Sequence, residues 1–164
     1  MGTRSGEIDP AIVSFIMDHE DMTAKQVNNY LNNKAGVLGI SGVSFDFRDI
    51  EQAEKDGNER AGLAIDVFAY TVRKFIGSYF LALNGLDVIV FTAGLGENSP
   101  IVREKIIEPM DCLQTYLDYE KNKTGKGAYK ISTESSKIQI WVVPTNEELM
   151  IAKETKAICK LNKA

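Results

Sequence analysis

The stretch that decides the fold is Asp87-Val88-Ile89-Val90-Phe91-Thr92-Ala93-Gly94-Leu95-Gly96-Glu97-Asn98-Ser99-Pro100. Its first part is apolar and β-branched, which is typical of a strand buried on both faces of a sheet. Gly94 and Gly96 then predict a turn in which the backbone takes positive φ and lies close to a ligand. A helix is expected directly afterwards, with Ser99 as its N-cap and Pro100 as its first residue.

This succession of strand, glycine-rich turn and helix start brings unpaired N–H groups and the positive end of a helix dipole to one point. Such a point suits a phosphate or a nucleotide sugar. The stretch has no third glycine for a dinucleotide fingerprint and no Gly-Lys-Ser/Thr for a P-loop. An ordinary strand-to-helix turn is the alternative, and the spacing alone does not choose between the two.

The composition is that of a globular protein. The chain has 164 residues, of which 44% are hydrophobic and 26% charged, enough for one well-packed domain and too few for two. Its net charge of -4 is at odds with the basic stripe of a nucleic-acid-binding protein, so we expect no such partner. Small anions can still bind where the local charge is positive.

Cysteine and histidine are sparse. Cys112, Cys159 and His19 are too few and too far apart for a zinc site or a disulfide framework, which predicts a reducing, cytoplasmic setting. We recognise no signal peptide. The most apolar long segment, residues 61–83, is interrupted by three charged residues, so it predicts a buried helix and no membrane span.

Periodicity and capping signals predict the other elements. The helix at residues 58–84 is apolar nearly all round, so we expect it to be covered on nearly all sides as the central helix of a layered α/β domain. Strand–helix–strand succession favours a parallel sheet with helices on its faces. Residues 111–127 predict a surface excursion. Further helices are expected at residues 10–18, 23–36, 50–55 and 100–109, the second of them opened by a capping box of Thr23 and Gln26. Strands are expected at 88–91, 129–133 and 137–143, the last two as a hairpin or as neighbouring strands.

Arg4 is the first candidate for chemistry. It lies in a loop between Gly2 and Gly6, from which a guanidinium fork can project toward an oxyanion. The alternative is a solvated arginine on a disordered tail.

The triplet Asp46-Phe47-Arg48 is the second candidate. In an extended chain Asp46 and Arg48 point to one side and Phe47 to the other, so a loop here could hold a planar ligand by its polar edges. The alternative is a local ion pair of little energetic value.

The third candidate is a carboxylate at the start of the last helix. Thr145 is expected to be its N-cap, with Glu148 at the reciprocal position of a capping box. Glu147 would then be free to face a ligand, and a metal ion is the obvious one. Alternatively, both glutamates merely favour the positive end of the helix.

Four sequence blocks, in this order, resemble the carboxy-terminal domain of the acetate kinase family. The resemblance covers all 164 residues and implies one carboxy-terminal nucleotide-binding domain, residues 1–164, with the amino-terminal domain absent. It implies an α/β, ribonuclease H-like fold of the acetate and sugar kinase, Hsp70 and actin superfamily, with a mixed sheet flanked by helices. The blocks are Met1-Gly2-Thr3-Arg4-Ser5-Gly6 with Asp9-Pro10, Ile40-Ser41-Gly42-Val43-Ser44-Phe45-Asp46-Phe47-Arg48, Phe91-Thr92-Ala93-Gly94-Leu95-Gly96-Glu97-Asn98, and Pro144-Thr145-Asn146-Glu147-Glu148-Leu149.

The resemblance also implies roles for the candidate residues named above. Two positions depart from the family pattern: Phe45 stands where a small polar residue is expected, and Ala93 where glycine is common. The matching residues are Arg4 for the catalytic arginine; Asp46, Phe47 and Arg48 for the nucleotide-binding triplet; Gly94, Leu95, Gly96, Glu97 and Asn98 for the glycine-rich ATP loop; and Glu147 for the glutamate that helps to hold magnesium.

The implied activity is the reversible, Mg²⁺-dependent phosphorylation of acetate by ATP, a phosphotransfer to a carboxyl group. The implied partners are ATP or ADP, acetate or acetyl phosphate, and a second copy of the chain as a homodimer, with no membrane. Because the remaining active-site groups of the family belong to its first domain, we expect the chain alone to be inactive or nearly so. The alternatives are a non-catalytic nucleotide-binding or dimerisation module, and a relative that acts on propionate or butyrate.

Overall fold

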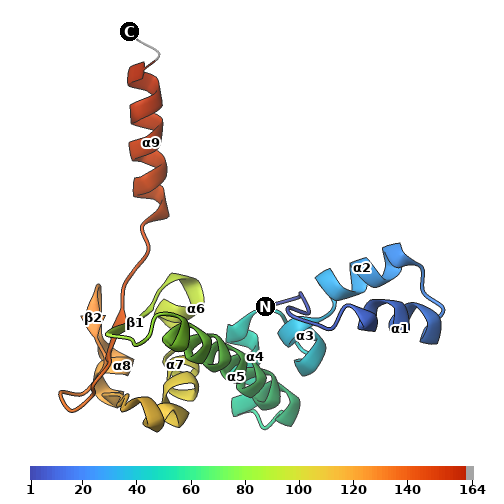
Figure 1. Ribbon diagram of the computed structural model, residues 1–164, viewed down its shortest axis with the longest axis horizontal. Coiled ribbons are helices and arrows are strands. Elements are labelled where there is room, and N and C mark those ends of the chain that lie inside the picture. Colours follow the sequence, from blue (N-terminus) through green and yellow to red (C-terminus); the bar gives the residue numbers. More distant parts are fainter. Residues whose placement is uncertain (162–164) are drawn as a thin grey trace. The chain divides into compact units, whose positions relative to one another are not determined.

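The structure is a computed structural model that describes residues 1–161 and divides into two compact units. The first unit is Met1–Ala82, and the second begins at Leu83. Each unit has buried apolar residues of its own. The first contains only helices and loops, and the second contains the sheet (Figure 1).

Helices make up the first unit. Its elements are α1 (Ala11–His19), α2 (Ala24–Asn33), α3 (Gly36–Ser41), α4 (Phe47–Lys55) and α5 (Glu59–Ala82).

Local capping signals place the first two helices, as predicted. Thr23 Oγ1 accepts from the N–H of Gln26, and Gln26 Oε1 accepts from the N–H of Thr23, so the capping box of α2 is present. At the start of α1, Asp9 Oδ1 accepts from the N–H of Ala11 at 2.9 Å. His19 is the last residue of α1.

The long helix α5 supplies much of the core of the first unit. Helices α3 and α4 pack against it, and its buried residues are Ala61, Ala64, Ile65 and Ala69. The prediction that this helix is covered on nearly all sides is wrong for the described residues, since Leu81 is 78% exposed. Twenty-four residues extend roughly 36 Å at about 1.5 Å per residue, and the short α3 and α4 cannot cover that length.

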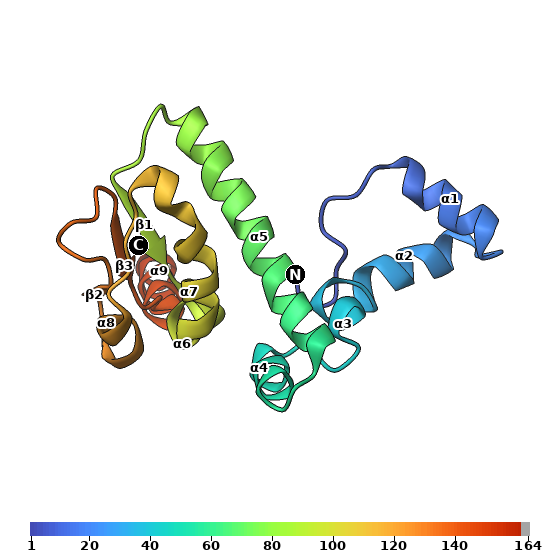
Figure 2. The ribbon, with the colours of Figure 1, turned by 90° about the horizontal axis from the view of Figure 1, so that it is seen from below.

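The second unit is a mixed sheet with helices, which confirms the predicted fold class. In Figures 1 and 2, α6 and α7 lie beside β1. The elements are β1 (Val88–Phe91), α6 (Ala93–Asn98), α7 (Pro100–Ile107), the 3-10 helix η1 (Glu108–Leu113), α8 (Tyr119–Thr124), β2 (Tyr129–Lys130), β3 (Gln139–Val142) and α9 (Glu147–Leu161).

The strand order is β1-β3-β2. β1 pairs with β3 in parallel, with Ile89 opposite Ile140, and β2 pairs with β3 antiparallel, as the predicted hairpin requires. The prediction that the first strand is buried on both faces is wrong in the described structure. Ile89 is buried while Val90 is 51% exposed, because successive side chains point to opposite faces of the sheet and the core covers one of them.

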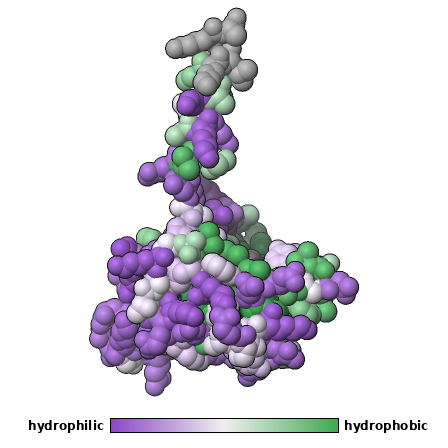
Figure 3. Space-filling view, turned by 90° about the vertical axis from the view of Figure 1, so that its left-hand side faces the viewer, coloured by the Kyte–Doolittle hydropathy of each residue, from purple (hydrophilic) through white to green (hydrophobic). Residues whose placement is uncertain are grey.

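The surface excursion predicted for residues 111–127 is only partly one. Leu117 and Asn122 are buried there, and α8 carries the latter into the core of the second unit. By contrast, the part of α9 whose burial is described, residues 147–159, is exposed throughout. Figure 3 shows hydrophobic residues among the hydrophilic ones along this helix.

Candidate functional site

The loop that carries Arg4 is fixed by main-chain hydrogen bonds on both sides of this residue. The N–H of Ser5 donates to the oxygen of Leu31, and the N–H of Ala35 donates to the oxygen of Thr3, each at 2.9 Å. The side chain of Arg4 is exposed. The alternative of a disordered tail is therefore wrong, and the guanidinium extends from a fixed backbone.

Gly36 makes this attachment of the loop possible. Its φ is 61°, a conformation that side chains disfavour. A β-carbon here would overlap the main-chain oxygens of Met1, Gly2 and Arg4, the last at 2.8 Å. The loop therefore lies directly on the glycine that begins α3.

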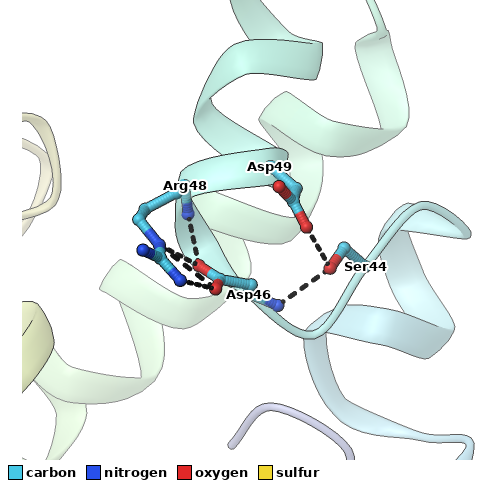
Figure 4. Close-up of polar contacts among 4 residues, drawn as sticks. All are labelled: Ser44, Asp46, Arg48 and Asp49. Atoms are coloured by element: carbon cyan, nitrogen blue, oxygen red, sulfur yellow. Dashed lines mark hydrogen bonds and ion pairs between the residues drawn. The ribbon is translucent and has the colours of Figure 1, made fainter.

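The Asp46-Phe47-Arg48 triplet begins a helix, so the prediction that it forms an extended loop is wrong. Asp46 is the N-cap of α4 and accepts from the N–H of Arg48 at 2.9 Å. Its carboxylate also accepts from Arg48 Nε at 3.1 and 3.2 Å and from Nη2 (Figure 4). The local ion pair considered as an alternative is thus present, and the helix turn brings its partners together.

These contacts fix the charge state of the pair. The hydrogen bonds from the Arg48 side chain, and then from its main-chain N–H, lower the pKa of Asp46 to about 2. Ser44 completes the arrangement, since its Oγ accepts from the N–H of Asp46 and donates to Asp49 Oδ2 at 2.8 Å (Figure 4). The Arg48 side chain is 90% exposed and remains accessible to an anion.

Phe47 packs away from this polar group. Its ring meets that of Phe68 on α5 edge to face, with centroids 4.8 Å apart. The same region touches the Arg4 loop, because a β-carbon on Gly2 would lie 3.4 Å from the main-chain oxygen of Phe45. The first unit therefore places the Arg4 loop next to the residue before the triplet.

The glycine-rich segment forms the short helix α6 in place of an open turn. Positive φ occurs at Ala93 (60°) and at neither Gly94 nor Gly96, so the prediction for the two glycines is wrong. Glycine, which the resemblance implies is common at position 93, would take this conformation without strain. Gly96 serves close packing, because a β-carbon there would lie 3.3 Å from the main chain of Phe91.

The helix start after this segment is as predicted. Ser99 is the N-cap of α7, and its Oγ accepts from the N–H of Val102 at 3.1 Å. Pro100 is the first residue of this helix. Within α6, Asn98 Nδ2 donates to the oxygen of Gly94 at 2.7 Å.

Arg103 supports the glycine-rich segment from the core, and sequence reasoning missed it. It is 1% exposed, and its Nη1 donates to the oxygens of Gly96 at 2.8 Å and Glu97 at 3.0 Å. Its Nε and Nη2 donate to Oδ1 and the main-chain oxygen of Asn122, both at 2.7 Å. Burial lowers the pKa of Arg103. The signal that could have found it is its place among the apolar residues of α7.

The start of α9 differs from the prediction. Asn146 Oδ1 accepts from the N–H of Leu149 at 2.9 Å, so Asn146 is the cap, and the capping box expected for Thr145 and Glu148 is wrong. Thr145 is instead bonded to Glu97, whose Oε1 accepts from its N–H at 2.9 Å and its Oγ1 at 3.0 Å. These bonds, that from the N–H first, lower the pKa of Glu97.

Glu147 is exposed at the first turn of α9, two residues after Thr145. The second unit thus brings the glycine-rich segment and the helix that carries Glu147 together. Arg4 and the triplet lie in the first unit. That Arg4, Gly94 and Glu147 serve one active site, as the roles implied by the resemblance require, stays a prediction.

A cavity of about 270 Å³ is lined by Ile16, Glu20, Met22 and Tyr30 in the first unit. None of these four is a predicted site residue. Among residues 1–161, no three His, Cys, Asp or Glu side chains gather as they would around a metal ion. Over the same residues, no helix has the length and apolar character needed to cross a membrane.

Comparison with known proteins identifies the family. The model of the acetokinase family matches residues 1–153. The chain is 55% identical to the acetate kinase of Caldicellulosiruptor saccharolyticus and 57% identical to that of Thermoanaerobacter pseudethanolicus. These alignments cover 96% and 98% of this chain and 40% of each relative, so the chain spans two fifths of the length of these curated relatives.

Solved structures agree. The crystal structure of Porphyromonas gingivalis acetate kinase matches with a TM-score of 0.89 and 44% identity, over 97% of this chain and 40% of that one. A propionate kinase from Francisella tularensis matches with a TM-score of 0.87 and 42% identity, over 94% and 39%. With its mixed sheet flanked by helices and the family model matched from the Arg4 loop into α9, the chain belongs to the acetokinase family.

Proposed function

We propose that this chain is the carboxy-terminal, nucleotide-binding part of an acetate kinase. The full-length polypeptide would transfer the γ-phosphoryl group of ATP to acetate, reversibly, to form acetyl phosphate. The observation that carries the proposal is the identity of 55–57% to acetate kinases over nearly the whole chain. All the predicted site residues, from Arg4 to Glu147, fall within the residues that the family model matches.

Arg4 is assigned to the reacting groups. Its exposed guanidinium on a fixed loop is free to face both the acceptor carboxylate and the phosphoryl group in transfer. An acetate oxygen attacks the γ-phosphorus, the bond to the β,γ-bridging oxygen breaks, and ADP leaves. An arginine that stabilises the charge of such a transition state contributes about 10³-fold or more in rate.

The triplet and the glycine-rich segment are assigned to the nucleotide. Asp46 holds the Arg48 guanidinium in one orientation, which leaves its outer edge for the ligand. The segment Gly94–Asn98 lies at the carboxyl end of β1, where α/β sheets commonly bind ligands. Arg103 keeps its main chain in place.

Glu147 is assigned to Mg²⁺, with Glu148 as the neighbouring alternative. The residues fit this ion, because Mg²⁺ on a nucleotide uses one or two carboxylates, phosphate oxygens and water, and Glu147 offers one exposed carboxylate. When bound, the ion neutralises charge on the outer phosphates. Glu147 itself would hold and orient the bound nucleotide through that ion.

The 164-residue chain alone is expected to be inert or nearly so, since much of the acetate pocket is expected in the rest of the protein. An assay that traps acyl phosphate as the hydroxamate tests this. Formation of acyl phosphate by the purified chain, above the level of an Arg4→Ala variant, would contradict it.

Nucleotide binding separates an enzyme part from a scaffold. In isothermal titration of the chain with ADP and magnesium, we expect heat of binding from a nucleotide-binding unit. A non-catalytic dimerisation module, the alternative function, gives none.

A second candidate concerns the acyl acceptor, because a propionate kinase is among the matching structures at 42% identity. Acceptor choice is expected to lie largely outside this chain. Comparing kcat/KM for acetate, propionate and butyrate in the full-length protein decides it.

We further propose a homodimer formed through this chain, in the cytoplasm, with no nucleic-acid or membrane partner. The net charge of -4 agrees with the absence of a nucleic-acid partner. Gel filtration with light scattering tests the dimer, and a monomeric mass at micromolar concentration would oppose it.

A further inference from the structure

The Glu97–Thr145 contact joins two segments that lie far apart in sequence. Glu97 Oε1 receives both the N–H and the Oγ1 of Thr145, at 2.9 and 3.0 Å, across 48 positions. Glu97 belongs to the glycine-rich segment, and Thr145 stands two residues before Glu147. One carboxylate oxygen therefore links the two candidate ligand-binding elements of the second unit.

We propose that Glu97 is a positioning residue that fixes the main chain at Thr145 and so holds Glu147 next to the glycine-rich segment. This inference rests on the proposed function, because it assumes that the segment binds the nucleotide and Glu147 the magnesium ion. In this proposal the Glu97 side chain binds Thr145 of the protein itself, and other atoms of the glycine-rich segment contact the nucleotide.

The surrounding hydrogen bonds explain why this contact can set the position of Glu147. The sheet ladder ends where the N–H of Val143 donates to the oxygen of Phe91 at 2.9 Å. Helix α9 begins at Glu147. The three residues between are neither strand nor helix, and Glu97 binds the middle one through two charge-assisted hydrogen bonds.

Glu97 is itself well held at its main chain. Arg103, buried in α7, donates to the Glu97 oxygen at 3.0 Å and to that of Gly96 at 2.8 Å. A carboxylate on a fixed backbone is a suitable anchor, because it loses little conformational freedom of its own when it binds the strand-to-helix connection. Arg103 in the core therefore holds the main chain of Glu97, and the Glu97 side chain in turn holds Thr145.

The test measures ADP affinity of the chain in excess magnesium and in EDTA, together with amide hydrogen exchange at Thr145. The variants are Glu97→Ala, Glu97→Gln, which keeps an acceptor oxygen, and Thr145→Val, which replaces the hydroxyl by a methyl group and keeps the main-chain N–H. The matched control is Glu134→Ala, which removes an exposed carboxylate bonded to Lys130 at 2.7 Å.

We expect Glu97→Ala to lower ADP affinity about tenfold in magnesium and by a clearly smaller factor in EDTA, because loss of groups that orient metal ligands weakens the metal-dependent part of binding. Exchange at Thr145 rises by about tenfold or more. Glu97→Gln keeps most of the wild-type affinity in magnesium and most of the protection at Thr145. Thr145→Val loses part of the affinity in magnesium, and the control loses neither affinity nor protection.

Equal loss of affinity with and without magnesium would overturn the proposal, because Glu97 would then touch the nucleotide. Unchanged exchange at Thr145 in Glu97→Ala would overturn it as well. If the wild-type chain binds no ADP in either condition, the proposed function fails by itself, and exchange at Thr145 alone decides whether Glu97 fixes this segment.

Discussion

Arg103 Nη1 donates to the main-chain oxygen of Gly96 at 2.8 Å, so a buried cation on α7 holds the backbone of the glycine-rich segment. A guanidinium has a planar fork of donors that can satisfy several carbonyl oxygens at once. Here those oxygens belong to α6 and α8, and Asn122 extends the network to Glu104 Oε1 at 3.0 Å. The position of the segment therefore depends on residues outside it.

Replacing Arg103 by alanine is expected to lower the free energy of unfolding of the chain by about 3–5 kcal/mol, because buried oxygens lose their donors. Arg103→Lys should recover part of this loss, since an ammonium keeps the charge and lacks the fork. Urea unfolding followed by circular dichroism measures both. The exposed Arg48→Ala is the control, and an Arg103→Ala midpoint equal to that of the control would refute the assigned role.

Gly36→Ala is expected to displace the loop that carries Arg4. The β-carbon would overlap three main-chain oxygens in addition to the strain of φ 61°. Gly57→Ala is the matched control, because φ is 90° there and nothing lies within 4 Å of the added carbon. The control should cost about 1–2 kcal/mol of conformational strain, and Gly36→Ala clearly more.

Thermal unfolding gives the difference between these two glycine variants, and exchange of the Ser5 amide reports the loop directly. Equal destabilisation by both substitutions, with unchanged exchange at Ser5, would mean that the loop does not need Gly36.

The free energy of unfolding should decrease as the pH is lowered through the titration range of Asp46. Its pKa in the folded chain is about 2, below the usual 3.8, so its contribution is complete above pH 3.8 and is lost as the pH falls from 3.8 to about 2. Asp46→Asn should flatten the dependence of unfolding free energy on pH in this window. Carboxyl-carbon NMR gives the pKa itself, and a value near 3.8 would contradict the ion pair with Arg48.

Thr23→Ala is expected to cost about 1 kcal/mol of unfolding free energy, because it removes the N-cap of α2. Thr23→Ser keeps the hydroxyl and should be nearly neutral. Gln26→Ala tests the reciprocal bond, and in the double variant the losses should be less than additive since both residues form one capping box. Strict additivity would indicate that the two bonds are independent.

The sequence by itself determined the elements whose signals are local. The Thr23–Gln26 box, the Ser99-Pro100 helix start and the strand at residues 88–91 are all present, because the partners that define them are near neighbours in the chain. The four ordered blocks identified the family. None of these predictions depends on contacts between residues that are far apart in the chain.

The tertiary structure decided what depends on distant partners. Thr145 was predicted to cap α9, yet Glu97 takes its N–H and hydroxyl from 48 residues away, and Asn146 caps the helix in its place. Two of the acceptors that satisfy the buried Arg103 belong to Asn122, which α8 brings to it from 19 positions along the chain. The N–H of Thr145 has a local acceptor, Glu148, and a distant one, Glu97, and it bonds to the one that the fold places better. The order of residues along the chain does not show which acceptor that will be.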